Sequence, residues 1–138
     1  MDHLPSWLLT QTAAYAHRLV GERFAEIGAR GYHYRLLAQL LTGPASQADL
    51  GRHTGIHFSD VVAALNELAD GGYLERRPDP ADKRRNVVTI TAAGRRRARE
   101  LADRAAAIQE ELLAPLTATD RAELVRLLTL LRAGAAAE

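Results

Sequence analysis

Apolar residues recur at every third or fourth position along most of the chain, which is the spacing of an α-helix that packs on one side. Read together with glycine, proline and capping signals, this pattern predicts six helices. The predicted helices run from about Pro5 to Ala29, Tyr32 to Leu41, Ser46 to Gly55, Phe58 to Asp70, Thr91 to Ala114, and from Thr117 onward. The third and fourth are short and are joined by a glycine-bearing turn, as a helix-turn-helix requires.

Local signals set the ends of these helices. Gly43-Pro44 stops the second helix and Pro115 breaks the fifth. Ser46 with Asp49 has the spacing of a capping box, and Thr117 to Asp120 repeats that spacing before the last helix. The boundaries are therefore predicted from residue type as well as from periodicity.

Two strand-like runs lie between the fourth and fifth helices. Leu74-Glu75-Arg76-Arg77 precedes a loop rich in proline and charge, and Val87 to Thr91 follows it. A hairpin behind a compact helix pair predicts a mainly α fold with a small β-hairpin wing. We therefore expect a winged helix-turn-helix with long N- and C-terminal helices, and we find no internal repeat and no second domain.

Charge is distributed unevenly along the chain, although the net charge is only +1. Nine basic and three acidic residues lie between Glu75 and Arg99, a surplus of +6, so the rest of the chain carries −5. A basic segment of this kind predicts a face that meets phosphates. The alternative for the arginine run alone is a solvated charged helix.

Composition excludes several classes of protein. Apolar residues make up 47% of the 138 residues and charged residues 25%, which is ordinary for a soluble globular domain. The absence of cysteine rules out disulfides, and the five histidines lack metal-ligand spacing, so we predict no metal and no cofactor. No nucleophile elbow or phosphate-binding glycine loop is visible, and an enzyme is not expected. Without a signal peptide or a long apolar run, the protein is expected to be cytoplasmic and not membrane-bound.

Three motifs in register resemble the MarR family of transcriptional regulators. Gly72-Tyr73-Leu74-Glu75-Arg76 is similar to the family's Gly-Leu-Val-x-Arg, and Asp79 to Arg84 matches its Asp-x-x-Asp-x-Arg wing tip. Val88 to Gly94 resembles the pattern after the wing, with Ile-Thr in place of Leu-Thr. The resemblance covers nearly the whole chain.

This resemblance implies one MarR-type domain over residues 1–138. Residues 31–91 would form the DNA-binding lobe, and residues 1–30 and 92–138 the dimerisation helices. An apolar cluster near the C terminus favours a homodimer as well, because it needs a partner surface. It consists of Leu112, Leu113, Leu116, Leu124, Leu127, Leu128 and Leu131. The alternative is that these leucines fold back onto the first helix within one chain.

The wing tip is expected to carry cations on a rigid loop, in which two prolines fix φ. Asp79 and Asp82 have side chains suited to bonding turn N–H groups and to orienting Arg84, and the alternative for both is simple turn chemistry. Arg84 has a planar guanidinium that fits a narrow, electronegative minor groove. Lys83 and Arg85 are interpreted as phosphate contacts, which give affinity but no sequence choice.

The fourth helix is expected to lie in the major groove. The predicted DNA-binding residues are Ser46, Gln47, His57, Ser59, Val62, Ala63, Asn66, Lys83, Arg84 and Arg85. Asn66 is suited to an adenine edge, and Val62 or Ala63 to a thymine methyl group. Phe58 either joins this face or packs against the preceding helix. The face has no lysine or arginine, which departs from the usual family pattern and shifts specificity toward the wing and DNA shape.

By resemblance, a small aromatic effector would bind between the dimerisation helices and the lobe. Trp7, Tyr15, His17 and Tyr34 are the candidate pocket residues. The alternative is that these aromatic residues belong to the core or to an interface.

We therefore predict a homodimeric, sequence-specific repressor that binds a pseudo-palindromic duplex and is released by such an effector. Two other interpretations stay open. The winged helix is either a protein-interaction module or an architectural DNA binder without sequence preference. Strong salt dependence separates the first of these from a DNA-binding protein.

Overall fold

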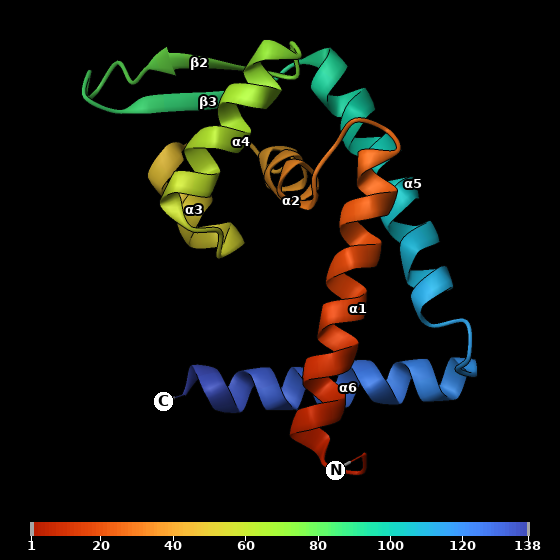
Figure 1. Ribbon diagram of the computed structural model, residues 1–138. Helices are drawn as coiled ribbons and strands as arrows, with labels where there is room; N and C mark the ends of the chain where they lie inside the picture. The colour runs from red at the N-terminus through yellow and green to blue at the C-terminus, as the bar shows by residue number, and fades with distance from the viewer. Residues whose placement is uncertain (1, 138) are drawn as a thin grey trace.

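A computed structural model describes residues 2–137, which form six helices and three strands (Figure 1). In chain order these are α1 (Pro5–Ala25), α2 (Gly31–Leu40), β1 (Ala45–Ser46), α3 (Gln47–Thr54), α4 (Phe58–Asp70), β2 (Leu74–Pro78), β3 (Asn86–Ile90), α5 (Ala92–Leu112) and α6 (Ala118–Ala136). Helices α1 and α5 run side by side, with the lobe of α2, α3, α4 and the hairpin at one end and α6 at the other (Figure 1). The predicted mainly α fold with a β-hairpin wing is confirmed.

Capping residues begin the helices where the sequence predicted. The backbone N–H of Asp49 donates to Ser46 Oγ at 3.1 Å, and that of Asp120 donates to Thr117 Oγ1 at 3.1 Å. Each bond satisfies a donor that the first helical turn leaves unpaired. Helix α4 has the predicted bounds, and its predicted stripe of Val61, Ala64, Leu65 and Leu68 is buried.

Two helices end earlier than predicted. Helix α1 stops at Ala25 rather than near Ala29, because the chain turns at Gly28, whose φ of 68° lies in the left-handed region that favours glycine. Helix α5 stops at Leu112, short of its predicted end, since Pro115 disfavours helical backbone in the residue before it. Both differences lie outside the lobe.

The sheet has three antiparallel strands in the order β1-β3-β2. Strands β2 and β3 form the predicted hairpin, with Leu74 opposite Ile90 and Pro78 opposite Asn86. Strand β1 was not predicted. It pairs only two residues with β3, and so short a strand carries no alternating pattern in the sequence.

The core lies inside the lobe and along the inner side of α5. Its largest fully buried side chains are Leu36, Leu37, Leu40, Leu50, Leu65, Leu68, Leu101, Ile108, Val61 and Val88. The hairpin closes tightly on α5 at Gly94, where an added Cβ would lie 1.9 Å from the carbonyl oxygen of Tyr73. The wing is therefore fixed to the long helix by a contact that only glycine permits.

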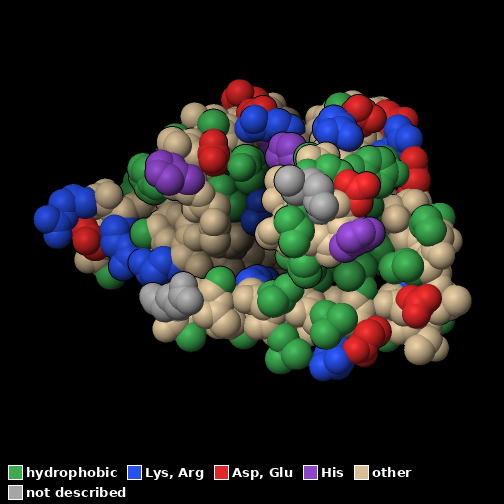
Figure 2. Space-filling model, turned by 60° about the horizontal axis from the view of Figure 1, so that its bottom comes forward, with side chains coloured by type: hydrophobic (Ala, Val, Ile, Leu, Met, Phe, Trp, Pro, Cys, Tyr) green, Lys and Arg blue, Asp and Glu red, His purple; other side chains and the backbone are tan. Residues whose placement is uncertain are grey.

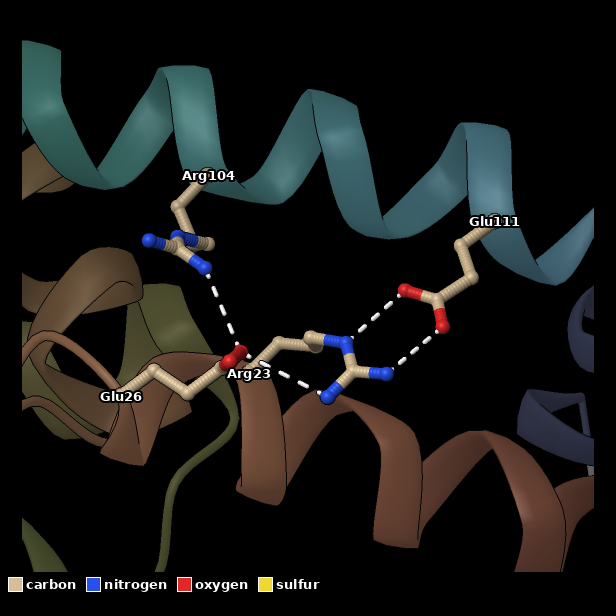
Figure 3. Close-up of polar contacts among 4 residues, drawn as sticks. All are labelled: Arg23, Glu26, Arg104 and Glu111. Atoms are coloured by element: carbon tan, nitrogen blue, oxygen red, sulfur yellow. Dashed lines mark hydrogen bonds and ion pairs between the residues drawn. The ribbon is translucent and has the colours of Figure 1, made fainter.

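An ion-pair network joins α1 to α5 beyond the lobe (Figure 3). Arg23 donates from Nε and Nη2 to the two carboxylate oxygens of Glu111, at 2.9 and 2.7 Å. Glu26 Oε1 lies 3.5 Å from Arg23 Nη1 and 3.3 Å from Arg104 Nη1. Water and salt screen exposed ion pairs, so this network fixes the alignment of the two helices more than it stabilises the fold.

Helix α6 buries none of its described residues. The face that it forms with the N-terminal half of α1 carries exposed apolar side chains, which Figure 2 shows gathered at this end of the molecule. They are Leu4, Trp7, Leu8, Leu9, Tyr15, Val125, Leu127, Leu128, Leu130 and Leu131. Of the predicted C-terminal cluster, Leu112 packs against the core, whereas Leu127, Leu128 and Leu131 of α6 stay exposed within this chain. No helix among residues 2–137 is long and apolar enough to cross a bilayer.

Candidate nucleic-acid interface

Helix α4 presents a polar and apolar face to solvent beside the wing. Ser59, Ala63 and Asn66 are exposed at i, i+4 and i+7, so they lie along one side of the helix. Val62 is half-buried next to them. Because the opposite stripe is packed into the core, this side is the one that α4 offers to another molecule.

The turn before α4 holds an exposed phenyl ring at the tip of the helix. Gly55 ends α3 with φ of 70°, and His57 caps α4 with Nδ1 accepting from the backbone N–H of Ser59 at 3.3 Å. The side chain of Phe58 is 60% exposed, so its predicted alternative, packing against the preceding helix, is wrong. Phe58 therefore extends the outward face of α4.

Backbone and carboxylate hydrogen bonds order the tip of the wing. The N–H of Asp79 donates to the carbonyl oxygen of Arg85 at 2.8 Å, and the N–H of Arg85 donates to the carbonyl oxygen of Asp82 at 3.0 Å. Asp79 Oδ1 accepts from the N–H of Ala81 at 2.9 Å. The loop is therefore an ordered, hydrogen-bonded turn, as predicted from its two aspartates.

Asp82 also orients Arg84. Its Oδ1 accepts from the backbone N–H of Arg84 at 3.1 Å and from Arg84 Nε at 3.2 Å. These bonds favour the carboxylate and hold the pKa of Asp82 below its usual value. The guanidinium side chain itself is 92% exposed, so a cation projects from an ordered turn into solvent.

The remaining predicted DNA contacts divide into exposed residues on the wing and less exposed residues at the start of α3. Lys83 is exposed, and Arg85 is exposed but lies 3.7 Å from a carboxylate oxygen of Asp49 on α3. Gln47, the first residue of α3, is half-buried. Ser46 is buried and its hydroxyl caps α3, an arrangement that opposes its predicted contact with phosphate.

The arginine run at the start of α5 divides as its helical positions require. Arg97 donates to the carbonyl oxygen of Ile27 at 2.6 Å, pairs with Glu100 at 3.0 Å and lies over the ring of Tyr73. It therefore supports the fold. Arg95, Arg96 and Arg99 are exposed, and each adds positive charge at the start of α5, the helix that follows the wing.

One contact across the lobe was not predicted. Arg76 of β2 donates from Nη1 to Asn66 Oδ1 on α4 at 2.7 Å, linking the base of the wing to the outward face of the helix. The sequence signal for it is weak, because Arg76 is one of two adjacent arginines. Only the pleat decides that Arg76 is half-buried and Arg77 exposed.

A second unpredicted cluster anchors α4 to the start of α2. Glu67 forms an ion pair with Arg30, and its Oε1 lies 3.5 Å from Nε2 of the buried His33. His33 Nδ1 accepts from the backbone N–H of Arg30 at 3.2 Å, so the neutral ring carries its proton on Nε2. Burial lowers the pKa of His33, opposed in part by the Glu67 carboxylate.

The predicted effector residues do not converge within one chain. Trp7, Tyr15 and His17 are exposed on α1. Tyr34 instead lines an open hollow of about 310 Å³ between α2 and α3. The hollow is lined by Tyr34, Arg35, Ala38, Gln39, His53 and Thr54.

A helix-turn-helix followed by an ordered basic hairpin defines a winged-helix protein. Residues 28–85 match the MarR family. The uncharacterized HTH-type transcriptional regulator YcgE of Bacillus subtilis is 34% identical over 59 residues, which are 43% of this chain. The chain spans 38% of the length of this curated relative.

Solved structures extend the likeness to the terminal helices. A probable transcriptional regulator from Pseudomonas aeruginosa is 30% identical, with a TM-score of 0.82 over 94% of this chain and 98% of that one. The PcaV transcriptional regulator from Streptomyces coelicolor is 26% identical, with a TM-score of 0.83 over 98% of this chain and 99% of that one. The chain belongs to the MarR family and has the winged-helix fold of its transcriptional regulators.

Proposed function

We propose that the protein is a homodimeric transcriptional repressor that binds a pseudo-palindromic DNA duplex in a sequence-specific way. The observation that carries the proposal is the pairing of an outward helix face with an ordered cationic wing on one lobe. The side chain of Arg84 is 92% exposed, yet its Nε and backbone N–H are both held by Asp82. A guanidinium oriented before binding loses less conformational freedom on entering a minor groove.

A second copy of this chain is the partner that we propose for the apolar face of α1 and α6. That face carries ten exposed large apolar side chains, and a cluster of this kind on one end of a small protein marks an interface. A two-fold dimer would place two lobes against two half-sites of a palindrome. Sedimentation at several protein concentrations tests it, and a monomer at micromolar concentration would contradict it.

DNA binding is tested by fluorescence anisotropy in a salt series, with a duplex selected from a random pool and a scrambled duplex of equal length. We expect the selected duplex to bind more tightly, and its affinity to fall steeply as salt rises. Arg84→Ala should weaken binding about tenfold or more. Arg18→Ala on α1 removes the same charge outside the wing and the helix-turn-helix and serves as the control.

Three other outcomes of this experiment would contradict part of the proposal. Equal affinity for both duplexes would indicate an architectural DNA binder. Contacts to phosphates are strongest at low salt, so a cationic wing that binds DNA should do so there. No binding to either duplex at low salt would therefore favour the protein-interaction module. Normal binding by Arg84→Ala would contradict the role of the wing.

We propose further that a small aromatic molecule releases the DNA. The PcaV regulator, in a structure 27% identical to this chain, has been solved in complex with its natural ligand, and Tyr34 lines a hollow beside the helix-turn-helix here. Trp7 is the only tryptophan, so quenching of its fluorescence by phenolic acids reports binding near α1. Release of labelled duplex by the same compounds tests the regulation, and compounds that bind without release would contradict it.

A further inference from the structure

The amide of Asn66 is held in one orientation by the guanidinium of Arg76. The donor Nη1 of Arg76 lies 2.7 Å from Asn66 Oδ1. Because a guanidinium has donors and no acceptor, the atom that it contacts must be the amide oxygen and not the amide nitrogen. The side chain of Asn66 is exposed, so its NH2 group is left to face solvent along the outer side of α4.

We propose that Arg76 is a positioning residue that makes Asn66 read guanine. A free asparagine recognises adenine by donating to N7 and accepting from the N6 amino group. Here the accepting oxygen already bonds a cation, and the adenine amino hydrogens would approach that positive group. Guanine presents only acceptors, N7 and O6, on its major-groove edge, and it matches an NH2 group that only donates.

The charge on Arg76 strengthens this choice. Arg77 pairs with Glu75 at 3.3 Å and Arg85 lies 3.7 Å from Asp49, whereas Arg76 forms no ion pair within residues 2–137. Its positive charge is therefore directed at the amide of Asn66 and at whatever meets that amide. Cytosine offers a donor at this edge and is disfavoured for the same reason as adenine, and thymine offers one acceptor where guanine offers two.

The position of Arg76 in the sheet keeps the guanidinium in place. Arg76 is paired with Val88, a fully buried residue of the central strand β3, and its own side chain is half-buried. The backbone of Arg76 is therefore fixed by the ladder, and few rotamers reach Asn66. The wing thus contributes to base reading at α4 without itself touching that base.

This inference rests on the proposed DNA binding, and the experiment separates the two. Affinities are measured for a selected duplex and for its single-base variants at every position, using the full-length protein and three variants. These are Asn66→Ala, Arg76→Ala and the matched control Arg77→Ala, and Arg76→Lys is added as a conservative fourth variant. A duplex with 7-deazaguanine, which lacks only the N7 acceptor, is included.

The wild-type protein should prefer guanine at one position of each half-site by roughly 5- to 100-fold. Asn66→Ala should lose that preference and become indifferent to 7-deazaguanine there. Arg76→Ala should shift the preference at the same position from guanine toward adenine, because it frees Oδ1. Arg77→Ala should weaken binding to all variants alike, and Arg76→Lys, which keeps a donor, should retain part of the guanine preference.

Three results would overturn the inference. Uniform weakening by Asn66→Ala at all bases would show a phosphate contact, and the proposed function would still stand. An unchanged guanine preference in Arg76→Ala, with an unchanged melting temperature, would remove the positioning role. If the wild-type protein bound all duplexes with equal affinity, both the guanine reading by Asn66 and the proposed sequence-specific function would be wrong.

Discussion

The winged-helix lobe and the terminal helices use similar leucine patterns with opposite results. Leu36 and Leu37 of α2 are fully buried, whereas Leu130 and Leu131 of α6 are each 58% exposed. The lobe closes its apolar stripes against its own helices and sheet. The α1 and α6 face has no such partner among residues 2–137. Periodicity therefore shows that a helix has an apolar side, and only the tertiary structure shows whether the chain itself covers that side.

Polar contacts sharpen the difference between the two regions. In the lobe many of them are short-range caps and turns that begin α3 and close the wing, and a few, such as the contact of Arg76 with Asn66, cross between elements. Between α1 and α5 they are exposed ion pairs that join residues far apart in the sequence, such as Arg23 and Glu111. Exposed ion pairs add little stability, so these pairs align α1 with α5, while buried side chains such as Phe24 and Ile108 pack the two helices against the core.

The largest expected effect tests whether the lobe alone carries the stability. Leu65 is fully buried, and Leu65→Ala should lower the free energy of unfolding by about 2–5 kcal/mol at every protein concentration. Leu131→Ala should lower it only where the protein is dimeric, so its effect should vanish on dilution. Urea unfolding at several concentrations measures both. If both variants lost the same free energy of unfolding at every protein concentration, the proposed difference between the lobe and the terminal helices would be wrong.

The next effect concerns the closest contact between the lobe and α5. Gly94→Ala should destabilise the protein by about 1–3 kcal/mol, since its Cβ would lie 1.9 Å from the backbone oxygen of Tyr73 and force a shift. Gly134 on α6 has nothing within 4 Å of its Cβ position, so Gly134→Ala is the matched control. It should stabilise by about 0.4–1 kcal/mol. Thermal unfolding distinguishes the two, and a tolerated Gly94→Ala would contradict the tight closure.

A smaller effect is the pH dependence that His33 gives the lobe. Burial lowers the pKa of His33 in the folded protein, and the unfolded value is about 6.5. Between the folded and unfolded values the unfolded chain binds more protons, so stability falls as pH decreases through that window. Above pH of about 6.5 the contribution is fully present. Glu67 raises the pKa, whereas Arg30 and Arg97 add to the lowering.

Nuclear magnetic resonance titration of the His33 ring and unfolding at several pH values check this prediction. His33→Gln removes the titrating group but keeps an acceptor for the N–H of Arg30. Its stability should be less dependent on pH below about 6.5. A folded-state pKa of His33 above that of an unfolded peptide would reverse the predicted sign.

Local signals explain why much of the fold could be predicted. Helix α4 lies between a cap at His57 and glycines at its end, and its bounds follow from those neighbours. The bend of the wing tip follows from Asp79 and Asp82 in the same way. Strand β1 was missed because a two-residue strand has no period to detect.

The site was predictable only where its chemistry is local. The contact between Arg76 and Asn66 joins side chains ten positions apart, on a strand and a helix, and depends on which arginine the pleat turns inward. The contact between His33 and Glu67 crosses from α2 to α4. The proposed pocket residues Trp7 and Tyr34 lie on separate helices, and periodicity carries no information on whether they meet.

The smallest expected effect on stability is at the wing tip. Local hydrogen bonds order this part of the lobe, and its side chains are not packed in the core. Asp82→Ala removes the acceptor of both Arg84 bonds, yet it should leave the free energy of unfolding almost unchanged because the tip is exposed. DNA affinity should nevertheless fall severalfold, since Arg84 would have to be ordered on binding. Asp82→Asn keeps Oδ1 and should retain most of the affinity. Equal binding by the wild type and both variants would show that the turn holds Arg84 without its carboxylate, and that the tip is ordered by its backbone alone.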